Sequence, residues 1–178
     1  MSPAPVSPLS LGIPGPLALV VMGVSGSGKT TIGRLLAVRL RWPFFDGDDY
    51  HPEANVAKMA VGCPLTDADR QPWLGRLRDL IQERLALGES SVVACSALKR
   101  SYRATLRAGD ERVRFLHLDG DFDLILGRMR SRAGHFMKAG MLRSQFETLE
   151  PPAQAIVIAV DAPPETVVEA AIRALRSG

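Results

Sequence analysis

A glycine-rich motif near the start of the chain constrains the fold more than any other feature of the sequence. Residues 23–30 read GVSGSGKT and match the pattern G-x-x-x-x-G-K-[ST]. They follow an apolar run at residues 17–22 and open a segment, residues 29–40, whose apolar side chains recur at helical spacing. A loop between a strand and a helix can hold a phosphate group, because its backbone N–H groups and the helix N-terminus converge on the anion. The pattern therefore predicts a nucleoside triphosphate site.

Each residue type in this phosphate loop, residues 23–30, suits a task in ATP binding. We expect Lys29 to reach the β- and γ-phosphates and the Thr30 hydroxyl to bind Mg²⁺, while the backbone holds other phosphate oxygens. A glycine-rich turn without a ligand is the alternative interpretation. The predicted ATP-binding residues of this segment are Gly23, Val24, Ser25, Gly26, Ser27, Gly28, Lys29, Thr30 and Thr31.

The remainder of the chain alternates short apolar runs with longer amphipathic segments. The runs at residues 92–95, 113–118 and 156–160 are typical of strands that are buried on both faces of a parallel sheet. Thr66 and Asp69, three residues apart, are expected to form a capping box at the start of the longest helix. This order predicts an α/β fold, a three-layer sandwich with a central parallel sheet. The predicted helices span residues 29–40, 68–87, 123–130 and 164–176.

Composition excludes several classes of protein. The 178 residues suit a single domain, and a net charge of +3 is too balanced to indicate a nucleic-acid partner. The longest apolar run, residues 17–24, is far shorter than the ~20 residues of a membrane helix, so we expect no membrane span. Cys63 and Cys95 lack metal-ligand or disulfide spacing, which predicts reduced thiols and a cytoplasmic protein.

The first 16 residues differ in character from the rest. Residues 1–16 contain five prolines and no basic segment of the kind that opens a secretory signal. We therefore expect a flexible, proline-rich leader followed by a single domain at residues 17–178 that contains the phosphate loop.

Two absent strings narrow the choice among phosphate-loop proteins. The chain has no NKxD string, which a GTPase uses to recognise guanine, and no apolar strand that ends in Asp-Glu, as motor and AAA-type ATPases have. It is also much shorter than those ATPases. A small-molecule kinase is the class that remains.

An acidic cluster follows a short apolar run at residues 44–45. Asp46 and Asp48 are expected at the carboxyl edge of the sheet, where α/β proteins bind ligands, and they share a face if the strand continues across Gly47. One carboxylate can hold a magnesium-bound water, and the other can accept the proton of an attacking hydroxyl. An acidic turn bent at Gly47 is the alternative.

Three longer strings carry a specific resemblance. DGDDYHPEANVAKMAVGCPLTDADRQPWL, VVACSALKRSYRATLR and GHFMKAGMLRSQFETLEPP closely resemble the thermoresistant-type gluconokinase family, from the phosphate loop to near the C-terminus. The resemblance implies ATP-dependent phosphorylation of D-gluconate to 6-phospho-D-gluconate. It also implies a P-loop NTPase fold of the adenylate and shikimate kinase type, a mobile lid and a homodimer.

The resemblance gives roles to several polar residues. It implies that Asp48 contacts a gluconate hydroxyl and acts as the base, that Asp46 lies near the metal, and that His51 lines the sugar-acid pocket. Arg70 is expected to bind the gluconate carboxylate, because a guanidinium group matches a carboxylate with two hydrogen bonds. The alternative for Arg70 is a salt bridge to a neighbouring aspartate of its own helix.

The CSALK string follows the predicted strand at residues 92–95. The resemblance places Ser96 and Lys99 at the substrate cleft. Capping of a helix that begins near Leu98 would explain Ser96 equally well.

A basic segment predicts a lid at about residues 128–140. Arg128 and Arg132 are four residues apart, hence on one helix face, and a glycine follows them as a possible hinge. Such a lid could bring both guanidinium groups to the transferring phosphoryl group. A solvated basic helix end is the alternative. From the resemblance, His135 and Gln145 are expected to contact gluconate.

The last strand is followed by the loop VDAPP at residues 160–164. In this fold such a loop lies beside the adenine ring, so Pro163 joins Arg128 among the predicted ATP-binding residues. An ordinary strand-to-helix turn is equally compatible. Two rival functions also remain: another small-metabolite kinase, such as a shikimate kinase, and a nucleotide-binding module without catalysis.

Overall fold

A five-stranded parallel sheet forms the centre of the molecule. The computed structural model describes residues 12, 15–131 and 139–177, so most of the predicted leader lies outside the described residues. The strand order is β2-β3-β1-β4-β5, and every pair is parallel. The strands are β1 (Ala18–Met22), β2 (Phe44–Asp46), β3 (Ser91–Ala94), β4 (Val113–Asp119) and β5 (Ala155–Ala159).

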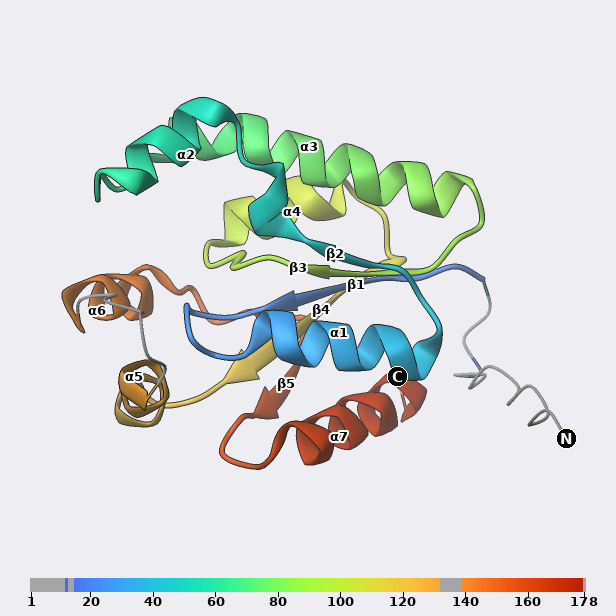
Figure 1. Ribbon diagram of the computed structural model, residues 1–178. Helices are drawn as coiled ribbons and strands as arrows, with labels where there is room; N and C mark the ends of the chain where they lie inside the picture. The colour runs from blue at the N-terminus through green and yellow to red at the C-terminus, as the bar shows by residue number, and fades with distance from the viewer. Residues whose placement is uncertain (1–11, 13–14, 132–138, 178) are drawn as a thin grey trace, which may run out of the picture.

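Helices cover both faces of the sheet, as Figure 1 shows. Helices α1 (Lys29–Leu40) and α7 (Pro164–Ser177) lie on one face, and α3 (Asp67–Ala86) and α4 (Arg100–Arg107) lie on the other. Helices α5 (Phe122–Ser131) and α6 (Ala139–Thr148) lie beyond the end of the sheet at which the strands finish. The predicted three-layer α/β sandwich is confirmed.

The core consists of two apolar layers that meet across the sheet. All five residues of β1 are buried. Leu19 and Val21 pack with α1 and α7, whereas Val20 and Met22 pack with α3. Burial of each such side chain contributes roughly 1.5 to 3 kcal/mol. The end of β1, where the phosphate loop begins, is therefore held by packing on both faces.

The longest helix begins as its sequence predicts. Thr66 Oγ1 accepts a hydrogen bond from Asp69 N at 3.1 Å, and Asp69 Oδ2 accepts one from Thr66 N at 2.9 Å. The two bonds satisfy backbone N–H groups that have no partner within the helix. The predicted capping box is confirmed, and it places the first turn of α3 beside the carboxyl edge of the sheet.

Two helices and one boundary differ from the sequence prediction. Helix α4 begins at Arg100, and its N-cap is Lys99 without a side-chain cap, so the prediction that Ser96 caps a helix near Leu98 was wrong. Helix α6 and the short helix α2 (Glu53–Ala60) were not predicted. Each of these two helices buries a single residue, so neither has an apolar stripe. Among the described residues, no helix is long and apolar enough to cross a membrane.

Candidate active site

The phosphate loop connects the end of β1 to the start of α1. Gly28, the N-cap of α1, has φ 98°, a left-handed conformation that is unfavourable for residues with a Cβ atom. Its carbonyl oxygen accepts the N–H of Ile32 at 2.9 Å, and Ser27 N donates to Val24 O at 3.2 Å. The loop curls around a small cavity of about 140 Å³, the phosphate-loop cavity. Its lining includes Ser25, Gly26, Gly28, Lys29, Thr30, Thr31, Asp46 and Asp48.

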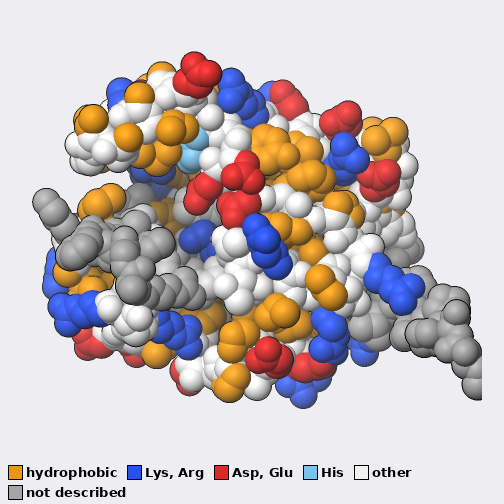
Figure 2. Space-filling model, viewed as in Figure 1, with side chains coloured by type: hydrophobic (Ala, Val, Ile, Leu, Met, Phe, Trp, Pro, Cys, Tyr) orange, Lys and Arg blue, Asp and Glu red, His pale blue; other side chains and the backbone are white. Residues whose placement is uncertain are grey.

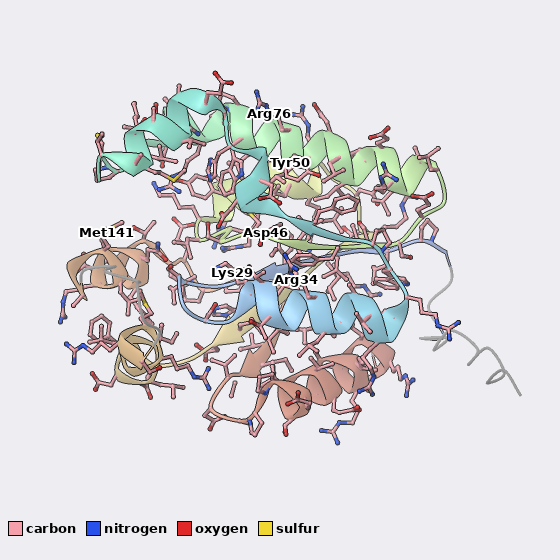
Figure 3. All side chains as sticks on the ribbon, in the orientation of Figure 1. Lys29, Arg34, Asp46, Tyr50, Arg76 and Met141 are labelled. Atoms are coloured by element: carbon pink, nitrogen blue, oxygen red, sulfur yellow. The ribbon has the colours of Figure 1, made fainter. Side chains whose placement is uncertain are left out.

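Lys29 presents its ammonium group inside this loop. Nζ donates to Val24 O at 3.0 Å, and Figure 3 shows Lys29 and Asp46 near each other, at the start of α1 and the end of β2. Desolvation by burial lowers the pKa of Lys29, while the carboxylates of Asp48 and Asp46 oppose that shift. A desolvated cation beside several backbone N–H groups suits a polyanion such as a triphosphate.

Thr30 and Asp46 form a pair of oxygen donors at the same cavity. Thr30 Oγ1 donates to Asp46 Oδ2 at 2.9 Å, and Asp46 Oδ1 accepts the backbone N–H of Asp48 at 3.2 Å. A hydroxyl and a carboxylate are the hard oxygen ligands that Mg²⁺ prefers. The donor set therefore fits the predicted magnesium site.

Asp46 and Asp48 both line the cavity, although the chain follows the alternative geometry, a turn bent at Gly47. The strand ends at Asp46, and a 3-10 helix, η1 (Gly47–Tyr50), turns the chain instead of continuing it in the extended form. Gly47 permits this turn, because a Cβ atom there would lie 2.4 Å from Ala94 O. Trp73 Nε1 donates to Gly47 O at 2.7 Å and holds the turn from α3. The turn therefore carries Asp48 to the cavity.

A second group of residues, the polar wall, adjoins the acidic turn and consists of His51, Asn55, Arg70 and Trp73. The ring of His51 stacks on Trp73, with 4.2 Å between ring centroids and 15° between planes. Asn55 Nδ2 lies 3.4 Å from His51 Nδ1 and donates to Asp69 O at 2.8 Å. Desolvation lowers the pKa of His51, Asp48 opposes that shift and Arg70 adds to it, so the imidazole is mainly neutral at pH 7.

Arg70, also part of the polar wall, is half-buried. Its Nη2 lies 3.4 Å from Leu65 O, and its guanidinium group lies over the Tyr102 ring, 5.8 Å from the centroid. The alternative of a salt bridge within its helix is not what the structure shows: Asp69 pairs with Lys58 at 2.7 Å, and Asp67 pairs with Lys99 at 2.7 Å. Within the described part of the chain, the Arg70 guanidinium forms no ion pair.

Lys99 connects two helices near the same edge. Its Nζ donates to both carboxylate oxygens of Asp67, at 2.9 and 2.7 Å, and the Tyr102 hydroxyl donates to Asp67 as well. Desolvation and the bond to Asp67 raise the pKa of Tyr102 to about 12. The ion pair between Lys99 and Asp67 thus links the start of α4 to the start of α3. Ser96 lies next to the phosphate loop, since its carbonyl oxygen accepts Gly23 N at 3.3 Å.

A larger cavity of about 470 Å³, the side cavity, lies on the other side of the phosphate loop. It is lined by the phosphate loop, by Arg128 and by residues 160–164, including Pro163. Arg128 Nη2 donates to Val160 O. The volume is within the range of small-molecule sites, which agrees with the prediction that this loop adjoins a nucleotide. Arg132 and His135 lie outside the described residues, as does most of the predicted lid.

Gln145 of α6 contacts the phosphate loop directly. Its Oε1 accepts the backbone N–H of Ser25 at 2.6 Å. Leu142 of the same helix packs with Val24 and Met129 in a small apolar cluster. The side chain predicted to contact gluconate is therefore hydrogen-bonded to the loop that is predicted to hold phosphate.

Figure 2 shows the hollow in which these residues meet, with acidic side chains at its margin, below the layer that contains α2 and α3. Basic and histidine side chains are visible within the hollow. Opposite charges thus gather where the strands end. Cys95, which also borders the phosphate-loop cavity, is buried, and burial raises the pKa of its thiol to about 12. Cys95 therefore acts as a packing residue and not as a nucleophile. Both cysteines are free, as predicted.

The capping box predicts a pH-dependent part of the stability. Hydrogen bonds from Lys58 and Thr66 lower the pKa of Asp69 from 3.8 to about 2. The folded pKa is the lower one, so the stabilisation is complete above about pH 4 and is lost as the pH falls toward 2. Asp69→Asn should lower the melting temperature by a few degrees at pH 6, and the difference from wild type should shrink by pH 3. Melting curves of both proteins check this.

Asp79→Asn is the control, because Asp79 is exposed and, among the described residues, its one ion pair is with the adjacent Arg78. A small, pH-independent effect is expected for that variant. An Asp69→Asn deficit that stays constant from pH 6 to pH 3 would contradict the assignment of the shift to Asp69.

Comparisons with known proteins agree with this geometry. A family model described as shikimate kinase matches residues 25–175, so the chain belongs to this family of kinases. Within it, a gluconokinase from Gluconobacter oxydans (strain 621H) is 48% identical over 161 residues, which cover 89% of this chain and 90% of the relative. This chain belongs to the gluconokinases. The thermoresistant gluconokinase of Escherichia coli (strain K12) is 44% identical over 163 residues, 89% of this chain and 93% of that protein.

Solved structures give the same result. A gluconokinase from Sinorhizobium meliloti 1021 superposes with a TM-score of 0.81 at 44% identity and covers 91% of this chain and 93% of its own. A shikimate kinase from Aquifex aeolicus reaches a TM-score of 0.57 at 19% identity, covering 90% of this chain and 97% of its own, which shows the shared fold alone. The predicted family resemblance and the kinase fold are confirmed. The shikimate kinase alternative for the function is not favoured.

Proposed function

We propose that this chain transfers the γ-phosphoryl group of ATP to D-gluconate, giving 6-phospho-D-gluconate and ADP. The observation that carries the proposal is the position of Asp48 between the phosphate loop and the polar wall. It lines the phosphate-loop cavity with Lys29, and its charge acts on both Lys29 and His51. A carboxylate in that position can accept the proton of a sugar hydroxyl while that hydroxyl oxygen lies close to the phosphates of ATP.

The phosphate loop and its neighbours bind ATP in this proposal. The backbone of residues 23–31 surrounds the phosphates, and Lys29 exchanges its bond to Val24 O for β- and γ-phosphate oxygens. Thr30 and Asp46 would hold Mg²⁺, which neutralises phosphate charge when it is bound.

The polar wall receives the sugar acid. Arg70 binds the gluconate carboxylate, and neutral His51 can donate a hydrogen bond to one sugar hydroxyl and accept one from another. Asp48 accepts the proton of the attacking hydroxyl as the oxygen–phosphorus bond forms and the bond to the ADP oxygen breaks. Ser96 and Lys99 complete the predicted cleft. In the described structure Lys99 is bound to Asp67, so its contact with gluconate would require that ion pair to open.

The side cavity receives the nucleoside part of ATP. Pro163 and its loop supply apolar contact and backbone groups, and Arg128 stands between that loop and the phosphate loop. Arg128 and Arg132 act on the transferring phosphoryl group, and His135 on the sugar acid, as the sequence predicts. The direct bond between Gln145 and Ser25 supports a role for Gln145 in positioning the phosphate loop as well as in meeting the substrate.

Loss of Arg70 should weaken gluconate binding selectively. Arg70→Ala removes two charge-assisted hydrogen bonds to the carboxylate, so the KM for D-gluconate should rise by about ten- to a hundredfold while the KM for ATP changes little. Steady-state kinetics with each substrate varied in turn measure both constants. Arg78→Ala is the control, because Arg78 lies on the same helix and pairs with the adjacent Asp79. A larger rise in the KM for ATP would move Arg70 out of the acid pocket.

Acceptor dependence separates a kinase from a nucleotide-binding module. ADP release from ATP and Mg²⁺ should be slow without an acceptor and should rise by orders of magnitude with D-gluconate. A protein that binds ATP but releases no ADP with any acceptor would be a binding module.

The cellular setting remains as the sequence predicts it. We infer that the chain works in the cytoplasm on a small-molecule substrate, without a nucleic-acid or membrane partner. The family resemblance supports a homodimer. Light scattering of the purified protein should give twice the 19.2 kDa chain mass, and a mass near one chain would contradict the dimer.

A further inference from the structure

A third cavity lies away from the active site. This arginine groove has a volume of about 430 Å³ and runs between α4 and the segment that precedes β5, over Phe115 of β4. It shares no lining residue with the phosphate-loop cavity or the side cavity. Its lining residues are Arg100, Arg103, Ala104, Arg107, Phe115, Pro152, Ala153 and Gln154.

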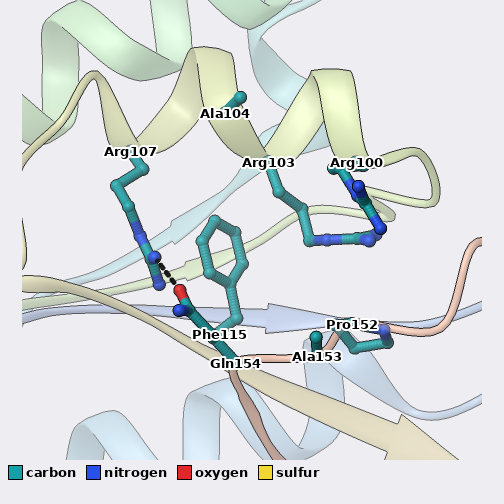
Figure 4. Close-up of a pocket in the computed structure, with 8 residues that line it drawn as sticks. All are labelled: Arg100, Arg103, Ala104, Arg107, Phe115, Pro152, Ala153 and Gln154. Carbon is teal, nitrogen blue, oxygen red and sulfur yellow. Dashed lines mark hydrogen bonds between the residues drawn. The ribbon is translucent and has the colours of Figure 1, made fainter.

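Three arginines of one helix face this groove. Arg100, Arg103 and Arg107 have the spacing i, i+3 and i+7, which places them on one side of α4. Helical rise separates the first from the last by about 10 Å along the helix axis. Figure 4 shows Arg107 at one end of the groove, Arg100 at the other, and the Phe115 ring between them.

Of these three arginines, Arg103 is bound to backbone carbonyl groups of the protein itself. It is 8% exposed, and its guanidinium group donates to the carbonyl oxygens of Ala97, Leu98 and Glu150, at 2.9, 2.9 and 2.8 Å. These bonds use its terminal N–H groups to join the loop that follows β3 to the segment that follows α6. Arg103 therefore adds positive charge to the groove but has few donors left for a ligand.

Arg107 and Arg100 retain donors. Arg107 Nη1 donates to Gln154 Oε1 at 2.8 Å, and its guanidinium group lies over the Phe115 ring, 5.5 Å from the centroid. Its Nε is buried and has no hydrogen-bond partner among the described residues. Among the described residues its Nη2 also makes no hydrogen bond, so this donor remains for an acceptor that enters the groove. At the other end, the exposed Arg100 side chain forms no ion pair within the described part of the chain.

Glu150 opposes part of this positive charge. The Glu150 carboxylate accepts the backbone N–H of Arg100, and its charge also acts on Arg103. Of the described residues that line the groove, three are arginines and none is acidic, so the lining carries net positive charge. The groove thus has a positively charged arginine at each end and an apolar middle formed by Ala104, Phe115 and Pro152.

We propose that the arginine groove binds an elongated organic anion that carries an acidic group at each end. Arg107 and Arg100 bind the two acidic groups, and the carbon body lies against Phe115 and Pro152. The chemical class includes sugar bisphosphates, phosphorylated sugar acids and dicarboxylic acids. Because none of the groove residues belongs to the active site, the proposal stands independently of the proposed function.

Calorimetric titration with two matched probes tests the proposal. Hexane-1,6-bisphosphate carries a phosphate at each end, and hexyl phosphate has the same carbon chain with only one. Saturating ADP and Mg²⁺ keep both probes from the phosphate loop. The bisphosphate should bind with one-to-one stoichiometry and at least about tenfold more tightly than the monophosphate, because the latter lacks one set of charge-assisted hydrogen bonds.

Three variants locate the binding. Arg100→Gln and Arg107→Gln should each weaken bisphosphate binding by about tenfold or more. Arg173→Gln is the control, because it makes the same charge change on the exposed side of α7, and it should weaken binding by less than about twofold. Arg100 is exposed, so its replacement tests the groove even if the Arg107 variant folds poorly. Absence of bisphosphate binding, equal affinity for the two probes, or equal affinity in Arg100→Gln and Arg173→Gln would overturn the proposal.

Discussion

Replacement of Lys29 by alanine should lower kcat by about a thousandfold or more. The ammonium is placed in the phosphate-loop cavity, where it would stabilise charge on the transferring phosphoryl group. The same replacement should leave the melting temperature unchanged or raise it, because burial desolvates the ammonium and lowers its pKa. A coupled ADP assay and a thermal melt measure the two quantities.

Lys58→Ala is the matched control for this prediction. Lys58 pairs with Asp69 at the start of α3 and lines neither the phosphate-loop cavity nor the side cavity. Its replacement should lower the melting temperature slightly and leave kcat nearly unchanged. A Lys29→Ala protein that is folded and retains near wild-type kcat would contradict the assignment of the phosphate loop.

Replacement of Asp48 by asparagine should lower kcat by about a hundredfold to ten-thousandfold, the usual contribution of a general base. The amide keeps the size of the side chain but cannot accept the proton of the gluconate hydroxyl. The KM for ATP should change little, because Lys29, Thr30 and Asp46 remain in place. Steady-state kinetics and calorimetric titration with ATP separate the two effects.

The adjacent acid provides the control. Asp49→Asn makes the same chemical change one residue away, at an exposed side chain that does not line the phosphate-loop cavity. Its kcat should stay within about twofold of wild type. If Asp48→Asn instead loses ATP binding and keeps its turnover at saturating ATP, Asp48 belongs to the nucleotide site and is not the base.

Local patterns predicted the sheet, the longest helices and the phosphate loop. Residues 17–22 and 29–40 carry a continuous apolar run and a helical period, and the glycines between them permit the turn that joins them. The capping box was predictable for the same reason, because Thr66 and Asp69 interact within one helical turn. Each of these features depends on residues that are close together in the chain.

Contacts between distant residues could not be predicted in the same way. The turn that carries Asp48 depends on the bond from Trp73 to Gly47, 26 residues away. Gln145 meets Ser25 across 120 residues. The sequence patterns gave no site role to Trp73 or to Asn55. The one signal for their position was the family resemblance of the strings that contain them, HPEAN and RQPWL.

The central claim is that the acceptor of the phosphoryl group is the C6 hydroxyl of D-gluconate. Phosphorus NMR of the reaction with ATP, Mg²⁺ and D-gluconate tests it most directly, with shikimate at the same concentration as the comparison. We expect one new phosphate monoester with D-gluconate, whose phosphorus couples to the two protons of C6, and no comparable product with shikimate. A monoester formed from shikimate alone, or ATP left unchanged with both acceptors, would contradict it.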